Sequence, residues 1–383
     1  RKLSLFKNTW IISTRRIVMI KPPSYVSEIK PYVPGKPIEE LERELGITDS
    51  IKLASNENPI GPSVKAMKAL LEGIMTPDVS SGINRYPDGS GYYLKKAIAE
   101  KLSVHEDEII LGNGSNELID IAIRTFIQPG DEVVMANPSF VVYFSSVHAQ
   151  GAKAVQIPLK DYIHDLDSMA DSITPKTKML FIANPNNPTG TINKKDELKR
   201  LMERISDDIL VVADEAYIEY VTDPEYAESM EYFKDGRNVL ILRTFSKIYG
   251  LAGLRIGYGI APKYIVTEMN KLRPPFNTNT LAQKAALAAI QDDEHVHASR
   301  AVNENGKQYL YEELNKLGIK YIPSQANFIY MILEQNSSEI YESLLRKGVI
   351  IRPVGQKEIR VTIGLPEQNK RFIEALGEVI NKK

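Results

Sequence analysis

Seven apolar runs of strand length alternate with segments of helical periodicity between residues 108 and 260. In one intervening segment, apolar residues recur at helical spacing from Leu118 to Phe126. Strands that are apolar throughout are typical of a parallel sheet covered by helices on both faces. The alternation therefore predicts an α/β domain of three layers around a seven-stranded, mostly parallel sheet. The seven runs are Glu108–Leu111, Glu132–Ala136, Ala154–Ile157, Met179–Ala183, Ile209–Ala213, Val239–Leu242 and Ile256–Ile260.

The pattern changes after about residue 275. A helical stretch covers roughly Leu281 to Leu317, and apolar runs separated by polar or helical sequence follow it. This mixture predicts a smaller α+β domain over residues 281–383, beside a large domain over residues 63–280. The apolar runs are Phe328–Leu333, Val349–Ile351 and Ile359–Ile363, and the last predicted helix runs from Gln368 to Ile380.

The N-terminal part of the chain has a different composition. Residues 25–62 are rich in proline and poor in periodic apolar residues, so we expect an extended arm that also contributes to the small domain. Residues 1–24 carry several basic residues, and no acidic residue precedes Glu28. Such a segment suits either a targeting peptide or an upstream extension before a natural start at Met19. We favour the extension, because there is no clear apolar core or cleavage site.

Length and composition narrow the class of protein. A chain of 383 residues with 43% hydrophobic and 25% charged residues can bury a large core, as ordinary globular proteins do. The formal net charge of -1 gives no electrostatic reason to expect nucleic acid or an anionic membrane as a partner. No apolar run approaches the roughly 18 residues of a membrane span. The absence of cysteine excludes disulfides and fits a reducing compartment, so we expect a cytoplasmic protein.

Polar motifs follow several of the predicted strands, where ligands of open α/β sheets usually bind. The first motif, Gly112-Asn-Gly114, precedes a helix that begins at about Ser115. The backbone amides of Ser115 and Asn116 could cradle a phosphate at this helix N-terminus. A glycine turn with Ser115 as the helix cap is the simpler interpretation when the motif is taken alone.

The second motif is the loop Asn184-Pro-Asn-Asn-Pro-Thr-Gly190. It directly follows a predicted strand, and its prolines and glycine leave it little conformational freedom. Such a loop could hold the Asn187 amide as a donor to a phenolate-like oxygen. A rigid turn without a binding role is the alternative.

The third motif places Asp214 immediately after a buried strand and Tyr217 three residues later. An unpaired carboxylate there would be unfavourable, and a protonated ring nitrogen would be a suitable cationic partner. The alternative is a helix cap at Asp214 and core packing for Tyr217.

The fourth motif runs from Thr244 to Gly257 and places Ser246, Lys247 and Arg255 among three glycines. A lysine in this setting could bond covalently to an aldehyde cofactor, and the serine and arginine could hold the phosphate of that cofactor. A solvated surface lysine is the default interpretation of any single lysine.

Together the four motifs resemble, in order and spacing, those of the fold-type-I pyridoxal-phosphate enzymes, specifically the class I and II aminotransferases. The resemblance extends over residues 25 to 383. It implies that Lys247 bonds to the cofactor aldehyde and later moves the substrate proton. It also implies that Asp214 keeps the pyridine nitrogen protonated. Asn187 and Tyr217 would donate to the 3-hydroxyl oxygen of the ring.

The same resemblance assigns the remaining cofactor contacts. Phe140 would stack on the ring, at a position where many relatives carry tyrosine or tryptophan. The phosphate would be held by Ser115, Asn116, Ser246 and Arg255. Tyr86, in the run Asn84-Arg-Tyr-Pro-Asp88, would reach the cofactor phosphate of a neighbouring subunit, which implies a homodimer with shared sites.

Two arginines eight residues apart bear on the substrate. The resemblance implies that Arg360 grips a substrate α-carboxylate as a planar fork, and that Arg352 is placed for a second anion. A surface salt bridge is the alternative for Arg352. Around Tyr32, Arg352 and Arg273-Pro-Pro-Phe-Asn277, the chain is most similar to the histidinol-phosphate aminotransferases, in which the residues matching Tyr32 and Arg352 contact the substrate phosphate. The implied amino acceptor is 2-oxoglutarate.

Other functions remain open at this stage. An aromatic amino-acid aminotransferase and a threonine-phosphate decarboxylase would use the same scaffold. A regulatory domain that binds the cofactor without catalysis is a more distant alternative, and the chain carries no basic motif for DNA. A metal hydrolase is disfavoured by five histidines, no cysteine and no His-Glu-x-x-His motif, so we expect no metal.

Overall fold

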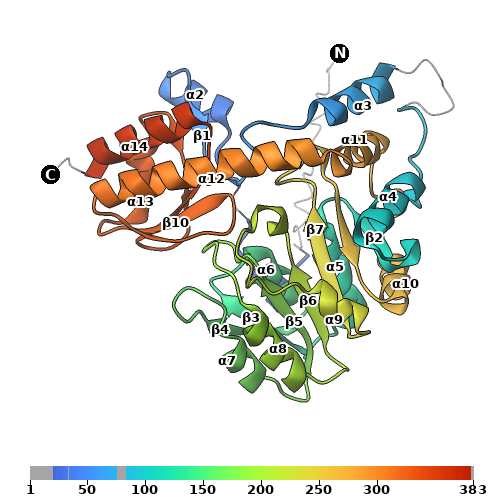
Figure 1. Ribbon diagram of the computed structural model, residues 1–383. Helices are drawn as coiled ribbons and strands as arrows, with labels where there is room; N and C mark the ends of the chain where they lie inside the picture. Colours follow the sequence, from blue (N-terminus) through green and yellow to red (C-terminus); the bar gives the residue numbers. More distant parts are fainter. Residues whose placement is uncertain (1–19, 33, 76–82, 381–383) are drawn as a thin grey trace, which may run out of the picture.

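The computed structural model describes residues 20–32, 34–75 and 83–380. Residues 1–19, including Met19, lie outside these ranges, so the choice between a targeting peptide and an upstream extension is not tested. Figure 1 shows a large α/β body, a smaller body that carries the C-terminal helix, and the long helix α12 (Asp293–Lys316) running between them. Within the described part of the chain, no helix combines the length and the apolar character needed to cross a membrane.

The large body is built on a seven-stranded sheet, as the sequence predicts. The strand order is β2-β8-β7-β6-β5-β3-β4, and only β8 runs antiparallel to its neighbours. The first strand begins at Ile109, because Glu106–Glu108 form a short 3-10 helix. The strands are β2 (Ile109–Gly112), β3 (Glu132–Asn137), β4 (Lys153–Pro158), β5 (Thr177–Ala183), β6 (Leu210–Asp214), β7 (Val239–Thr244) and β8 (Gly257–Ile260).

Helices cover both faces of this sheet because the side chains of each strand alternate between two apolar cores. In β2, Ile109 and Leu111 belong to one core and Ile110 to the other. The first core packs against α4 (Tyr92–Leu102), α7 (Leu166–Asp171), α8 (Lys195–Arg204), α9 (Met230–Lys234) and α11 (Thr280–Ile290). The second packs against α5 (Ser115–Phe126), α6 (Val141–Ala149) and α10 (Lys263–Leu272). Two further 3-10 helices are Ile218–Tyr220 and Ala252–Leu254.

The smaller body has its own apolar core around a four-stranded antiparallel sheet of order β12-β13-β10-β9. Its strands are β9 (Lys320–Ile322), β10 (Phe328–Ile332), β12 (Arg352–Pro353) and β13 (Glu358–Thr362). A separate parallel pair joins β1 (Ile51–Lys52) to β11 (Val349–Ile350). Helices α2 (Ile38–Leu45), α13 (Ser337–Leu345) and α14 (Pro366–Ile380) complete it.

The predicted helical stretch from Leu281 to Leu317 is two helices in the structure. Helix α11 ends at Ile290 and α12 (Asp293–Lys316) follows, because Asp292 leaves the helical conformation and accepts a hydrogen bond from Lys65. The apolar side chains of α11 and the start of α12 pack in the large body, whereas the end of α12 packs in the small one. On this packing, we propose that the small domain begins inside α12 rather than at residue 281.

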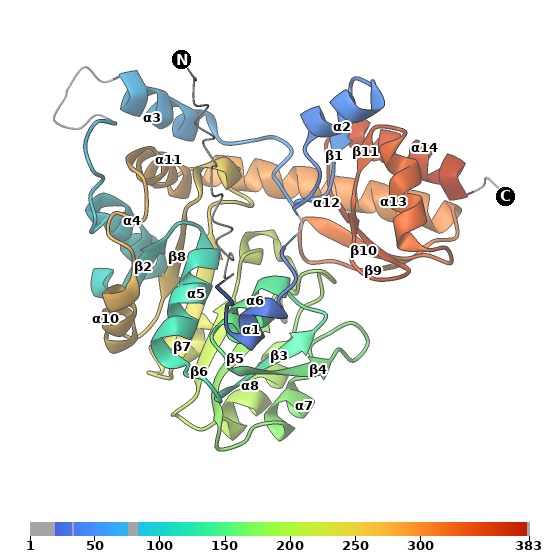
Figure 2. The same ribbon diagram turned by 180° about the vertical axis from the view of Figure 1, so that it is seen from behind.

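The N-terminal arm connects both bodies. Its short helix α1 (Ser24–Ser27) contacts α6 on the large body, as the view from behind shows (Figure 2). Further along, β1 pairs with β11 in the small body. The chain then enters α3 (Val64–Met75), which packs against α11. The arm therefore passes the carboxyl ends of the large-sheet strands, next to the pocket described below.

Candidate active site

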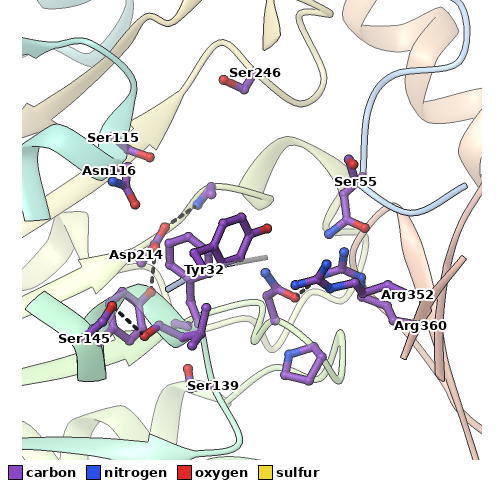
Figure 3. A pocket seen from close by; sticks show the side chains of 18 of the residues that line it. Tyr32, Ser55, Ser115, Asn116, Ser139, Ser145, Asp214, Ser246, Arg352 and Arg360 are labelled. Atoms are coloured by element: carbon purple, nitrogen blue, oxygen red, sulfur yellow. Dashed lines mark hydrogen bonds between the residues drawn. The ribbon is translucent and has the colours of Figure 1, made fainter. Parts of the chain in front are cut away.

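A pocket of about 950 Å³ lies where the arm, the small body and the carboxyl ends of the large-sheet strands meet. Of the site residues predicted from the sequence, all except Tyr86 line it. Figure 3 shows Ser115, Asn116 and Ser246 on one side of the pocket and Arg352 and Arg360 on the other. The complete set is Tyr32, Ser115, Asn116, Phe140, Asn187, Asp214, Tyr217, Ser246, Lys247, Arg255, Arg352 and Arg360.

Lys247 follows β7, and its side chain is partly buried rather than fully solvated. Burial, and next the positive charge of Arg360, lower the pKa of Lys247 from 10.5 to about 8. The Nζ atom donates a hydrogen bond of 3.2 Å to the backbone oxygen of Ser55. A substantial fraction of this amine is therefore neutral, and hence nucleophilic, close to neutral pH.

Asp214 ends β6 and is 7% exposed. The Tyr143 hydroxyl donates to Oδ2 of Asp214 at 2.5 Å, and the backbone N–H of Ala216 donates to Oδ1 at 3.2 Å. Burial raises the pKa of Asp214, and these two hydrogen bonds oppose that rise. The helix-cap alternative does not hold, because no helix begins at this carboxylate. A buried carboxylate with two neutral donors is suited to a cationic partner in the pocket.

Tyr217 lies three residues after the end of β6 and is buried. Its hydroxyl oxygen accepts a hydrogen bond of 2.8 Å from the Nδ2 atom of Asn56. The Tyr217 ring contacts Phe328 edge to face, with centroids 5.2 Å apart. Burial raises the pKa of Tyr217 to about 12, so this phenol keeps its proton throughout the physiological range.

Asn187 and Arg360 form a direct contact across the two bodies. Nη1 of Arg360 donates to Oδ1 of Asn187 at 2.5 Å, and Nη2 donates to the backbone oxygen of Ala54 at 2.6 Å. Because Oδ1 is engaged, the amide nitrogen of Asn187 is left as the group that can donate to a ligand. The Nε atom of Arg360 is buried and has no hydrogen-bond partner among the described residues.

Glycines shape the opposite end of the pocket around Arg255. Gly114 precedes α5 with a φ of 79°, and a Cβ atom there would collide with Nη2 of Arg255. A Cβ atom at Gly257 would lie 2.5 Å from the backbone nitrogen of Ser115. Nη1 of Arg255 donates to the Ser246 hydroxyl at 3.3 Å. Backbone amides, a hydroxyl and a guanidinium thus converge at the N-terminus of a 12-residue helix, which suits a phosphate.

Arg352 lies beside Arg360 because β12 and β13 pair in antiparallel register, with Arg352 opposite Arg360. Its guanidinium carbon lies 5.4 Å from the centroid of the Tyr32 ring, which the arm contributes. Burial lowers the pKa of Arg360, and the positive charge of Arg352 adds to this lowering. Two neighbouring guanidinium groups at one wall of a pocket favour anionic ligands.

Tyr86 is the one predicted site residue outside the pocket. Its side chain is 81% exposed, and its ring stacks on Phe276 with centroids 4.6 Å apart. A tyrosine that serves a second copy of the chain is expected to lie on the surface of its own copy. The role of Tyr86 across a dimer stays a prediction.

Sequence reasoning missed four pocket residues. Three of them are consecutive and hydrogen-bond to predicted site residues: Ala54 to Arg360, Ser55 to Lys247, and Asn56 to Tyr217. Tyr143, three residues after Phe140, is not among the site residues predicted from the sequence. The available signals were the polar run that follows Ile51–Ala54 and the second aromatic three residues after Phe140.

The arrangement fits a phosphorylated pyridine aldehyde. It provides an amine for the aldehyde, a carboxylate for the ring nitrogen, two donors for a ring hydroxyl, and a phosphate cradle. Phe140 lines the pocket and offers a flat apolar surface for the ring. Among the described residues, no group of three or more histidine, aspartate or glutamate side chains could hold a metal ion.

Comparisons with known proteins agree with this geometry. The family model Aminotransferase class I and II matches residues 48–376. The histidinol-phosphate aminotransferase of Moorella thermoacetica is 50% identical over 360 residues, which cover 93% of this chain and 92% of that protein. The corresponding protein of Caldicellulosiruptor saccharolyticus is 44% identical over 359 residues, which cover 93% of this chain and 99% of that protein.

Solved structures show the same fold. The histidinol-phosphate aminotransferase from Sinorhizobium meliloti in complex with pyridoxal-5'-phosphate superposes with a TM-score of 0.87 at 25% identity, covering 95% of this chain and 98% of that chain. A double mutant of aspartate aminotransferase from Thermus thermophilus superposes with a TM-score of 0.80 at 25% identity, covering 94% of this chain and 100% of that chain.

Proposed function

The chain belongs to the aminotransferase class I and II family, and on this premise we propose that it is a pyridoxal-phosphate-dependent histidinol-phosphate transaminase. It transfers the amino group of L-histidinol phosphate to 2-oxoglutarate. The products are imidazole-acetol phosphate and L-glutamate, and the reaction is a step of histidine biosynthesis. The similarity to named histidinol-phosphate aminotransferases over 93% of the chain supports this substrate.

When bound, pyridoxal phosphate supplies an electron sink for the negative charge that develops at the substrate Cα. Asp214 would hold a proton on the ring nitrogen, with Tyr143 and Ala216 keeping the carboxylate oriented. Asn187 and Tyr217 would donate to the ring oxygen. At the other end, Ser115, Asn116, Ser246 and Arg255 would hold the phosphate, and Phe140 would pack on the ring face.

Lys247 would move the proton. Its lowered pKa would leave Nζ able to accept a proton from the substrate Cα and to return it to the former aldehyde carbon of the cofactor. The hydrogen bond to the backbone oxygen of Ser55 keeps Nζ inside the pocket. This is why we assign Lys247 as both the covalent anchor and the general acid and base.

The neighbouring guanidinium groups of Arg352 and Arg360 are the structural feature that supports a phosphorylated substrate. The phosphate cradle at Arg255 is taken by the cofactor, so a second anion site is required for a phosphorylated substrate. Arg352, against the Tyr32 ring, would bind the phosphate of histidinol phosphate. Histidinol phosphate has no carboxylate, and Arg360 would therefore serve mainly the α-carboxylate of glutamate in the second half of the reaction.

A donor screen tests the assignment. The purified chain, loaded with pyridoxal phosphate, is given 2-oxoglutarate and one of four donors: histidinol phosphate, phenylalanine, tyrosine or threonine phosphate. We expect glutamate to form fastest with histidinol phosphate. Faster transfer from either aromatic amino acid, or release of carbon dioxide from threonine phosphate, would replace the proposal with one of the alternatives. No transfer from any donor would favour a regulatory domain.

We further propose a homodimer in which Tyr86 reaches the site of the other copy. An exposed apolar stripe on α3 supports this, since such stripes are buried when a partner packs on them. Its side chains are between 39% and 86% exposed, and they belong to Val64, Met67, Leu71, Ile74 and Met75. A cytoplasmic location is part of the same proposal and is consistent with the absence of cysteine.

A further inference from the structure

Asn56 is buried, and all of its polar groups have partners. Its backbone N–H donates to Oγ1 of Thr362 at 2.9 Å, and its backbone oxygen accepts from Nδ2 of Asn327 at 3.0 Å. In its side chain, Oδ1 accepts from Oγ1 of Thr362 at 3.2 Å, and Nδ2 donates to the Tyr217 hydroxyl at 2.8 Å. Its φ of 56° lies in the left-handed region, which few residue types other than glycine and asparagine adopt readily.

The Thr362 hydroxyl determines which way the Asn56 amide faces. A hydroxyl has a single hydrogen. Oγ1 accepts from the backbone N–H of Asn56 and donates its hydrogen to Oδ1 of the same residue. Oδ1 is therefore held at Thr362, and the NH₂ group is the end of the amide that meets Tyr217.

This orientation has a direct consequence for Tyr217. Its oxygen accepts from Asn56, so its only hydrogen is not used in that contact. No hydrogen bond donated by the Tyr217 hydroxyl is found among the described residues. The side chain lines the pocket, where that hydrogen can be donated to a ligand. The reversed amide would instead present Oδ1 to Tyr217 and draw the hydrogen away from the pocket.

We propose that Asn56, oriented by Thr362, is a positioning residue that directs the Tyr217 hydroxyl hydrogen toward the ring oxygen of the bound cofactor. This inference rests on the proposed function and adds residues that the sequence motifs did not include. Thr362 lies on β13, two residues after Arg360, so the strand that carries the carboxylate-binding arginine also sets the donor direction at the cofactor.

The test uses the colour of the chain loaded with pyridoxal phosphate. That colour changes with pH as the Lys247 nitrogen bonded to the cofactor loses its proton. A hydrogen bond from Tyr217 would stabilise negative charge on the ring oxygen, which the proton on the nitrogen otherwise neutralises. It would therefore lower the pKa of that nitrogen. Losing or weakening the donor should thus raise the midpoint pH of the colour change.

Asn56→Gly is the informative variant, because it removes the amide and keeps a residue that accepts a positive φ. We expect it to raise the midpoint by about 0.5 pH unit, roughly a threefold change in proton affinity. We expect Tyr217→Phe to raise it by about one unit. In the Tyr217→Phe background, Asn56→Gly should add no further shift, since no phenol is left to orient.

Thr362 gives an independent pair of variants. Thr362→Val removes the hydroxyl that fixes the amide and should raise the midpoint, whereas Thr362→Ser keeps the hydroxyl and should leave it in place. Equal shifts from Asn56→Gly with and without Tyr217, or no shift with Tyr217 present, would overturn the inference. Failure of the wild-type chain to develop any colour would instead contradict the proposed function itself.

Discussion

The Tyr143 hydroxyl donates a hydrogen bond of 2.5 Å to the Asp214 carboxylate inside the large body. The Tyr143 ring stacks on Phe181, with centroids 4.4 Å apart, so the hydroxyl has little freedom to leave the carboxylate. Asp214 is thereby kept oriented in a buried site where an unpaired carboxylate would be strongly disfavoured.

Tyr143→Phe should weaken cofactor binding by about tenfold, since a hydrogen bond to a charged group contributes roughly 1.5–3 kcal/mol. Equilibrium dialysis with pyridoxal phosphate measures this loss. Tyr226→Phe is the matched control, because Tyr226 is a buried phenol whose hydroxyl donates to the backbone oxygen of Asn184 rather than to a carboxylate. Equal losses in both variants would contradict a specific role for Tyr143.

The same variant has a pH signature in the cofactor-free chain. Burial already holds the pKa of Asp214 above its ordinary value of 3.8, so the folded state binds a proton more tightly than the unfolded state. Stability from this group therefore falls as pH rises above 3.8. Without Tyr143 the pKa rises further, and the unfolding free energy of Tyr143→Phe should drop more steeply between pH 4 and pH 7 than that of Tyr226→Phe.

The rate at which the cofactor-free chain takes up pyridoxal phosphate should increase with pH, with a midpoint at about pH 8, and level off about one pH unit higher. Only the neutral form of Lys247 attacks the aldehyde, and its pKa is lowered to about 8. Arg360→Gln removes the second-largest cause of this lowering and should move the midpoint to higher pH. Stopped-flow absorbance gives the profile, and a midpoint near 10.5 in the wild type would show that Lys247 is solvated.

Gly114→Ala should reduce cofactor affinity at least tenfold, because the added Cβ collides with the Arg255 guanidinium. The φ of 79° adds a conformational strain of about 1–2 kcal/mol. Gly236→Ala is the matched control, since Gly236 has a φ of 78° with nothing within 4 Å of the added atom. Both variants should lose similar stability, and only Gly114→Ala should lose affinity. A normal dissociation constant for Gly114→Ala would place the phosphate elsewhere.

Arg352→Gln should raise the KM for histidinol phosphate by about 100-fold, which corresponds to the loss of a charge-assisted pair. The KM for phenylalanine should change little, because that donor carries no phosphate. Lys357→Gln removes a positive charge from the same hairpin outside the pocket and should leave both values unchanged. If Arg352→Gln raises the KM for both donors equally, the arginine does not bind the substrate phosphate.

The shared site predicts complementation between two inactive chains. Tyr86→Phe and Lys247→Ala chains are refolded together, and each hybrid dimer contains one site with Lys247 and the partner's Tyr86 both intact. Activity should recover to about a quarter of wild type for random pairing, because half of the dimers carry one good site of two. No recovery, or a monomer on sedimentation, would contradict the arrangement.

The α/β layering and the positions of Asn187, Asp214 and Lys247 could be predicted from the order of residues along the chain. Each of these residues follows an apolar run, and parallel strands of a covered sheet bring their carboxyl ends to one edge. Local patterns are sufficient here, because the periodicity that predicts the strand also places the polar residue beyond it. The fold prediction is confirmed, and the chemical roles of the site residues stay predictions.

The orientation of these groups, in contrast, results from contacts between residues far apart in the chain. Asn56 meets Thr362 across 306 positions of sequence and Tyr217 across 161, and Tyr143 meets Asp214 across 71. No local periodicity encodes such contacts. The contacts of Asn56 depend on how the arm and the small body pack against the large sheet, and that of Tyr143 depends on how α6 packs on the sheet. The sequence therefore identified the candidate site residues, whereas three-dimensional packing sets the direction of each hydrogen-bond donor and the position of each charged group.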